Sequence, residues 1–232
     1  MVFLYATYQP PNSSPSLSKI LFIMRFSSLW SLILSIGFSL NTVIAKDTLE
    51  SVQKAFVQAG LVPDVLSSFN PILLLDVTYT IPDTNGEIKV VTPPGRNFTM
   101  PQTAIRPTWS IPSFDQGLAE ETFVVAMVDP DAPTPQDPSM SQIRHFLGGD
   151  FKLEGQPTAE GLGATLVNRT PALSDYIQPS PPNNSDAHSL TTSVENFNIS
   201  EFATQFKLGP PLAGNFMTLS TNPADLAAAG ES

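Results

Sequence analysis

The sequence predicts a mainly β protein with one core, built as a sandwich or a barrel of short strands. Three observations carry this prediction. The chain has 232 residues, which is enough for one sizeable domain. Its 23 prolines and 13 glycines suit a fold with many turns better than a helical bundle. Short apolar runs alternate with turn sequences, which favours antiparallel strands over βαβ units.

The first 45 residues have the features of a secretory leader. They contain no acidic residue, and an apolar run ends in the small-residue sequence Val43-Ile44-Ala45. We therefore expect a signal peptide over about 24–45, preceded by an N-terminal extension, with Met1 or Met24 as the start. The alternative is an uncleaved membrane anchor, since about 20 apolar residues can span a bilayer.

Cleavage after Ala45 would leave residues 46–232 as a single domain with no membrane span. Because Lys19 and Arg25 are lost, its net charge would change from −10 to −12. This charge argues against nucleic acid or an anionic membrane as a partner. Cysteine is absent, which excludes a catalytic thiol. We expect a secreted, extracellular protein, with membrane anchoring or the vacuole as alternatives.

Four Asn-X-Ser/Thr sequons lie beyond the leader and predict glycosylation in a eukaryotic export pathway. They begin at Asn97, Asn168, Asn183 and Asn198. Four are more than chance is expected to place in a chain of this length, so they support export.

The segments of regular structure follow from periodicity and turn residues. A short helix is expected over 48–60, capped by Asp47 and ended by Gly60, and a second over 197–209, capped at Asn198 or Ser200. A long proline-rich loop or linker is expected over 168–188. Strands are expected over 71–81, 88–91, 106–111, 121–128, part of 143–153 and 214–220, the first two joined by the turn 82–87.

Two aspartates follow the apolar strand, in the stretch Asp129-Pro-Asp-Ala-Pro. The proline at 130 favours an extended Asp129, and continued extension would place Asp129 and Asp131 on one face at the rim of the sheet. Two carboxylates there can accept hydrogen bonds or share a proton. The alternative is that each caps backbone N–H groups in a proline-rich turn.

The chain has only two histidines, His145 and His188, and each lies beside a candidate loop. Either can be a structural residue. A metal site shared with the two aspartates is chemically possible. However, the sequence has no H-E-x-x-H motif, no calcium loop and no G-x-S-x-G nucleophile elbow. We therefore expect neither an enzyme nor a cofactor.

The stretches DPDAPTPQDP, IRHFLGG and LSDYIQPSPP, followed by a histidine, resemble the phosphatidylethanolamine-binding protein family over about residues 47–219, and particularly its secreted fungal members. The resemblance implies a sandwich of two antiparallel sheets with small peripheral helices. It also implies a pocket at one end for a phosphate or a phospholipid head group. The matching pocket residues are Asp129, Asp131, Pro133, His145, Ser180, Pro181, Pro182 and His188.

The implied function is that of a monomeric, non-enzymatic binding protein for a phosphorylated or other anionic ligand. Inhibition of a serine carboxypeptidase, as in some relatives, is the alternative, and a degenerate family member without a ligand is a third reading. We expect phosphoryl binding to strengthen below about pH 6.5, where imidazoles become charged. One departure concerns the region after His188, where the family continues with Arg, Tyr and a long apolar strand. Here the polar SLTTSVENFN follows, so a pocket tyrosine and a central strand are expected to be missing.

Overall fold

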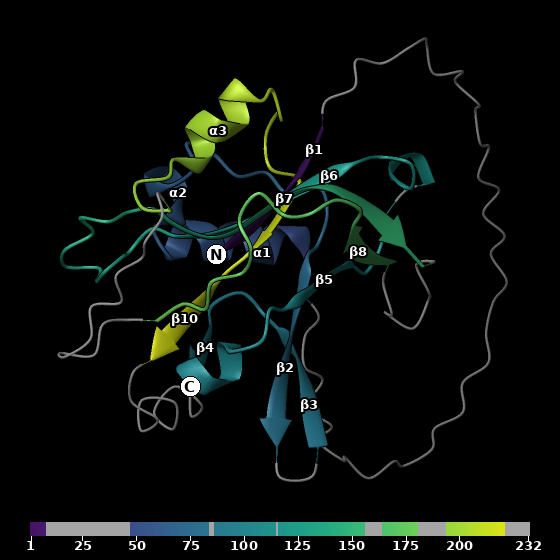
Figure 1. Ribbon diagram of the computed structural model, residues 1–232. Coiled ribbons are helices and arrows are strands. Elements are labelled where there is room, and N and C mark those ends of the chain that lie inside the picture. Colours follow the sequence, from purple (N-terminus) through teal and green to yellow (C-terminus); the bar gives the residue numbers. More distant parts are fainter. Residues whose placement is uncertain (8–46, 84–85, 115, 156–163, 181–193, 221–232) are drawn as a thin grey trace, which may run out of the picture. The chain divides into compact units, whose positions relative to one another are not determined.

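The computed structural model describes residues 1–7, 47–83, 86–114, 116–155, 164–180 and 194–220 (Figure 1). They belong to one unit that joins Met1–Tyr8 with Asp47–Ser232. As predicted, this unit is mainly β, with short helices beside the strands. None of the helices in the described ranges is long and apolar enough to cross a membrane. The predicted signal peptide lies outside the described residues.

An eight-stranded sheet forms the centre of the unit, in the order β3-β2-β5-β8-β7-β6-β1-β9. Its neighbouring strands are all antiparallel. Their bounds are β1 Val2–Ala6, β2 Asp76–Asp83, β3 Gly86–Thr92, β5 Thr108–Ile111, β6 Phe123–Asp129, β7 Ile143–Glu154, β8 Ala164–Asn168 and β9 Ala213–Asn215.

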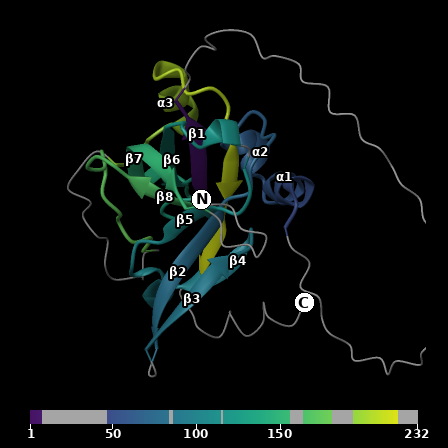
Figure 2. The same ribbon diagram turned by 90° about the vertical axis from the view of Figure 1, so that its right-hand side faces the viewer.

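A second, smaller sheet pairs β4 (Arg96–Thr99) with β10 (Met217–Ser220), as Figure 2 shows. This pair is parallel. The described part of the chain therefore has one large antiparallel sheet and one short parallel pair, whereas the resemblance implied two antiparallel sheets.

The predicted strands are present with shifted bounds, except that the single strand predicted over 214–220 is two strands, β9 and β10, which belong to different sheets. The β2–β3 hairpin forms as expected, with Ile81 opposite Ile88. The strand predicted over 71–81 begins only at Asp76, because the amides of Ile72 and Leu73 both donate to the Leu212 carbonyl, at 2.9 and 3.1 Å, instead of joining a strand.

The helix α1 (Leu49–Gln58) also forms as predicted, but its N-cap is Thr48 instead of Asp47. Thr48 Oγ1 accepts from the Ser51 amide at 3.0 Å, and Ser51 Oγ accepts from the Thr48 amide at 2.9 Å, which is a capping box. A one-turn helix, α2 (Leu61–Asp64), follows directly. The third helix, α3 (Ile199–Gln205), is capped by Asn198, as predicted.

The strand β1 lies in the interior of the sheet, between β6 and β9 (purple in Figure 1). From the sequence, residues 1–23 are expected to form an extension outside a domain that begins at residue 46. The structure corrects this boundary, because residues 1–7 form part of the sheet. The residues directly after His188, up to 193, lie outside the described residues, so the strand expected to be missing there stays a prediction.

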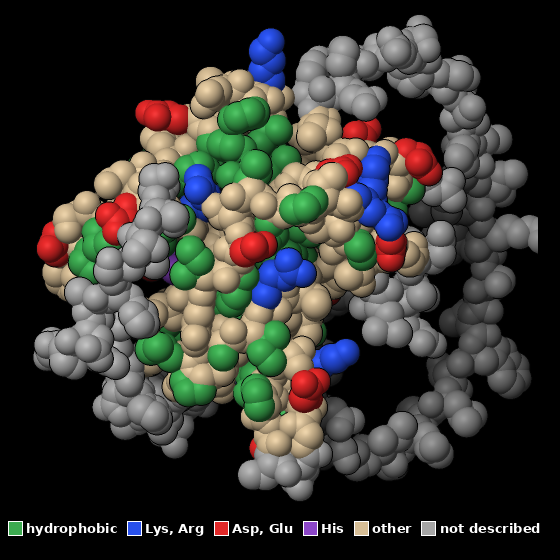
Figure 3. All heavy atoms as spheres, in the orientation of Figure 1, with side chains coloured by type: hydrophobic (Ala, Val, Ile, Leu, Met, Phe, Trp, Pro, Cys, Tyr) green, Lys and Arg blue, Asp and Glu red, His purple; other side chains and the backbone are tan. Residues whose placement is uncertain are grey.

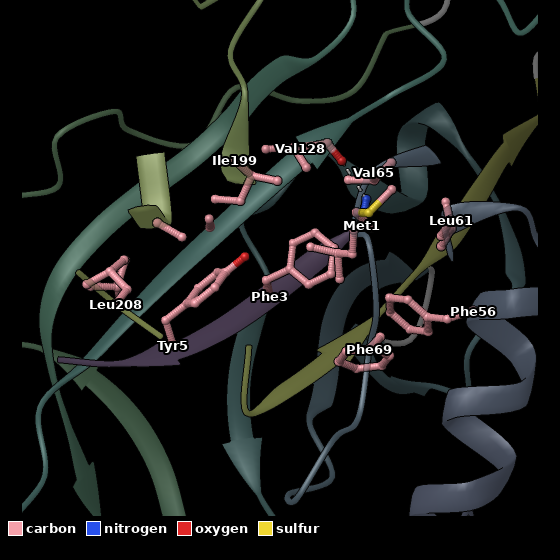
Figure 4. Packing of buried hydrophobic residues seen from close by; sticks show 14 of the residues in the cluster. Met1, Phe3, Tyr5, Phe56, Leu61, Val65, Phe69, Val128, Ile199 and Leu208 are labelled. Carbon is pink, nitrogen blue, oxygen red and sulfur yellow. Dashed lines mark hydrogen bonds between the residues drawn. The ribbon is translucent and has the colours of Figure 1, made fainter. Parts of the chain in front are cut away.

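Both faces of β1 are buried, because its side chains alternate between two apolar clusters. Phe3 and Tyr5 point into the cluster that includes residues of α1 and α3, as Figure 4 shows. Val2 and Leu4 point into the other cluster, which contains Trp109. The core of the unit is therefore continuous across β1.

Candidate functional site

Asp129 is the last residue of β6 and is half-buried. Its Oδ1 accepts a hydrogen bond from the backbone N–H of Asp131 at 2.9 Å. The chain turns at this point, so Asp131 leaves the strand and is exposed. The expectation that both carboxylates lie on one strand face is therefore wrong. Asp129 instead fits the alternative, in which an aspartate caps a backbone N–H in a proline-rich turn.

The loop that carries the two aspartates is anchored by Ala132. This residue is buried and packs with Ile143 and Val194. Its carbonyl accepts from the Met140 amide at 3.0 Å. Pro133 follows and is half-buried. The apolar anchor explains how a short loop with few regular hydrogen bonds can hold both carboxylates at the end of β6.

His145 lies on β7, the strand next to β6, and its side chain is only 6% exposed. Its Nδ1 is 2.9 Å from the carbonyl oxygen of Ile177, and the Ile177 amide donates to the His145 carbonyl at 2.8 Å. Its Nε2 is 3.9 Å from Asp129 Oδ2, which is longer than a hydrogen bond. The pairing of β6 with β7 thus brings the imidazole and the carboxylate together.

The contact with Ile177 determines which nitrogen of the ring can donate. A carbonyl oxygen only accepts hydrogen bonds, so the proton of a neutral His145 ring sits on Nδ1. The buried Nε2 has no hydrogen-bond partner within the described residues. In a neutral ring it presents a lone pair toward Asp129, and only a charged ring presents an N–H there. The site therefore offers a second donor when the imidazole is protonated.

The two aspartates differ in their affinity for a proton. Burial alone would raise the pKa of Asp129, but interaction with the His145 side chain and the backbone N–H of Asp131 lowers this pKa below its ordinary value. The pKa of Asp131 is raised, first by partial burial and then by the negative charge of Asp129. Asp129 therefore keeps its charge to lower pH than Asp131 does.

The other predicted pocket residues are only partly described. Ser180 is exposed, and its Oγ is 3.8 Å from Met100 Sδ. Pro181, Pro182 and His188 lie outside the described residues. The structure brings Asp129 close to His145 and to Asp131, places Pro133 in the loop after β6, and describes no contact of Ser180 with them.

Sequence reasoning missed Ile177 as a member of the site. Its contribution is a backbone carbonyl, and no side-chain pattern reports that. The segment before it pairs with β7 through Ser174 and Leu147, which exchange two backbone hydrogen bonds of 3.0 and 3.1 Å. Tyr176 fixes the segment further, because its hydroxyl donates to the Thr103 carbonyl at 2.6 Å.

An open cavity of about 460 Å³ lies apart from this pair and is lined by Tyr5, Leu66, Ser67, Ser68, Ser200, Ala203, Thr204, Lys207, Gly209, Pro210 and Pro211. Across the described ranges, no three His, Asp or Glu side chains cluster in a way that could hold a metal ion.

Three of the four sequons lie in the described part of the chain. Asn97 is half-buried in β4, and Asn168 Nδ2 donates to the Gly149 carbonyl at 2.5 Å. Asn198 is exposed, and it caps α3 through its Oδ1. Asn183 lies outside the described residues.

The described part of the chain is thus a mainly antiparallel β unit in which a buried histidine faces a carboxylate at adjacent strand ends. Residues 82–224 match the family model "Phosphatidylethanolamine-binding protein". The chain belongs to this family.

Two curated relatives illustrate the range of the family. The chain is 30% identical over 176 residues to a 26 kDa secreted antigen of Toxocara canis, covering 69% of this chain and 61% of the relative. It is 27% identical over 151 residues to the carboxypeptidase Y inhibitor of Saccharomyces cerevisiae, covering 58% and 68%. Another yeast relative is matched over only 53% of its length. The chain thus spans about half to two thirds of these proteins.

A solved structure has the same fold. It is the carboxypeptidase Y inhibitor complexed with its cognate proteinase, with a TM-score of 0.56 and 17% sequence identity. The match covers 79% of this chain and 100% of that one. At this identity the likeness establishes the fold.

Proposed function

We propose that this protein is a non-enzymatic binding protein whose site at Asp129 and His145 takes a phosphorylated amine, of which phosphorylethanolamine is the simplest. The observation that carries the proposal is the buried His145 Nε2, which faces Asp129 Oδ2 at 3.9 Å and has no hydrogen-bond partner within the described residues. A buried polar nitrogen of this kind is commonly satisfied by a ligand or water.

The charge of the site favours a ligand with both signs. The chain has a net charge of −10, and Asp129 and Asp131 lie at the site itself. A bare phosphate would gain a charged hydrogen bond from His145 but would be repelled by the carboxylates. An ammonium group on the same ligand offsets that repulsion by pairing with a carboxylate. A phosphorylated amine therefore complements the site better than phosphate does.

The test is calorimetric titration of the full chain at pH 5.5 and pH 8 with phosphorylethanolamine, inorganic phosphate and ethanolamine. Phosphorylethanolamine is expected to bind most tightly, and more tightly at pH 5.5, because a charged imidazole donates from both nitrogens. His145→Gln should weaken binding about tenfold or more, as for loss of a charged hydrogen bond. Asp83→Asn, on the exposed end of β2, is the matched control and should bind as the parent does.

Equal binding by the parent and His145→Gln would refute the proposal, as would tighter binding of phosphate alone. Vesicles with and without phosphatidylethanolamine then distinguish a membrane head group from the soluble ligand. Binding to the soluble compound but not to vesicles would identify a free phosphorylated amine as the ligand.

Inhibition of a serine carboxypeptidase is the second candidate, and a surface feature favours it. Figure 3 shows hydrophobic side chains gathered over α3. Here the rings of Phe197, Phe202 and Phe206 stack in sequence, with centroids 5.5 and 4.6 Å apart, and Phe206 is 57% exposed. Exposed apolar patches are typical of protein contacts. Inhibition that survives substitution of His145 and His188 but is lost in Phe206→Ser would assign the activity to this surface.

A further inference from the structure

The strand β1 is held as an insert between two strands that do not otherwise pair with each other. It forms five register pairs with β6, from Val2 opposite Met127 to Ala6 opposite Phe123. It forms three more with β9, from Val2 opposite Asn215 to Leu4 opposite Ala213. Beyond the strands, the Leu212 amide donates to the Leu4 carbonyl at 2.8 Å. We call the space between β6 (Phe123–Asp129) and β9 (Ala213–Asn215) the β6–β9 slot.

The walls of the slot fit the side chains of β1. Phe3 and Leu4 are 0% exposed, and Phe3 lies opposite Gly214. A Cβ atom on Gly214 would lie 2.9 Å from Phe56 Cζ and 3.3 Å from Phe3 Cδ1, so only a glycine leaves room for these rings. The Phe3 and Phe56 rings pack with centroids 6.1 Å apart. Figure 4 shows Phe3 pointing among Phe56, Phe69 and their neighbours.

Residues 8–46 separate β1 from the next described residue, Asp47. The entropic cost of closing such a connection changes slowly with its length, and its effect is to raise the local concentration of the strand. The same connection contains the predicted signal-peptide cleavage point after Ala45. Cutting there would separate β1 from the rest of the unit.

We infer that the β6–β9 slot is a binding site for the 1–7 segment, which stays bound as a separate strand when the chain is cut between residues 8 and 46. The mode is that of strand addition, in which main-chain hydrogen bonds give affinity and side-chain pockets give specificity. Here the strand gains two ladders instead of one, and its loss would leave both β6 and β9 with unpaired edges.

The test uses the full chain with a specific protease recognition sequence inserted between Ser13 and Ser14. The protein is folded, cut with the protease and passed over a gel-filtration column. Mass spectrometry then identifies the fragments in each fraction by their molecular masses. The N-terminal fragment is expected to elute with the larger piece. The thermal transition of the cut protein should become dependent on protein concentration, as for any complex of two chains.

Affinity is measured by displacement with a fluorescent peptide of residues 1–8. In the cut protein, Leu4→Ala should weaken retention of the N-terminal fragment about 30-fold or more, because a fully buried leucine is truncated. Leu173→Ala is the matched control, since Leu173 is 72% exposed, and it should change nothing. Leu4→Ala is preferred to a charged substitution because the uncut variant is expected to fold.

Release of the N-terminal fragment on cutting would overturn the inference, whether or not the larger piece kept the thermal transition of the uncut protein. Aggregation of the larger piece with loss of the fragment would overturn it as well, since the complex would not persist. Neither result bears on the phosphorylated-amine proposal, which is tested on the uncut chain.

Discussion

Asp129 Oδ1 accepts a hydrogen bond from the backbone N–H of Asp131 at 2.9 Å, so two carboxyl groups are held close together at the end of β6. The environments of the two carboxyl groups shift their pKa values in opposite directions. The pKa of Asp129 is lowered and that of Asp131 is raised. This contrast leads to opposite predictions for the two matched substitutions.

Asp129→Asn is expected to lower Tm at pH 7, by at most about 2–4 °C because a half-exposed charge is screened by solvent. A carboxyl whose folded pKa is lowered stabilises the fold above its unfolded value of about 3.9. This stabilisation is lost as the pH falls through the folded pKa. Calorimetry at pH 7 and pH 3 checks the prediction, and a difference from the parent that is as large at pH 3 would contradict it.

Asp131→Asn is expected to raise Tm at pH 7, by about 1–2 °C. A carboxyl whose folded pKa is raised destabilises the fold progressively as the pH rises from its unfolded value of about 3.9 through the folded pKa. The substitution removes this penalty, so the gain should be present at pH 7 and absent at pH 3. The same calorimetric series measures it, with Asp137→Asn in the same exposed loop as the control. A lower Tm at pH 7 would refute the assignment.

Gly214→Val is expected to lower Tm by about 2–10 °C, from an overpacking cost of about 1–3 kcal/mol. The added side chain would meet the rings of Phe56, Phe69 and Phe3. Gly149→Val is the matched control, because it also lies in a strand and a Cβ atom there meets nothing within 4 Å. Equal effects of the two substitutions in thermal unfolding would show that the β6–β9 slot is not tightly packed at Gly214.

Asn198→Ala is expected to lower Tm by about 2–4 °C, because the loss of a helix N-cap costs about 1 kcal/mol. Asn198 Oδ1 accepts from the amides of Ser200 and Glu201, each at 3.0 Å. Asn198→Ser removes the sequon but keeps a good cap, so it separates the effect of the cap from that of a glycan. In thermal unfolding of the unglycosylated proteins, the Tm of Asn198→Ser should be close to that of the parent. A value equal to that of Asn198→Ala would contradict the capping role.

Several elements follow from local sequence alone. The β2–β3 hairpin, the strands β5, β6 and β7, and the cap of α3 were predictable because turn residues, apolar runs and capping side chains act over a few positions. The position of Asp129 at a strand end was predictable for the same reason. Its partner Ile177 was not, because that contact depends on a bridge between segments far apart in the chain.

By itself the sequence determined that this is a mainly β protein of the phosphatidylethanolamine-binding protein family, with Asp129 and His145 as candidate site residues. Only the tertiary structure decided that Val2–Ala6 is an interior strand. Five apolar residues at the start of a chain carry no periodicity that distinguishes a strand from an extension. Their role comes from β6 and β9, whose unpaired edges and apolar side chains are more than a hundred positions away and are brought together only by folding.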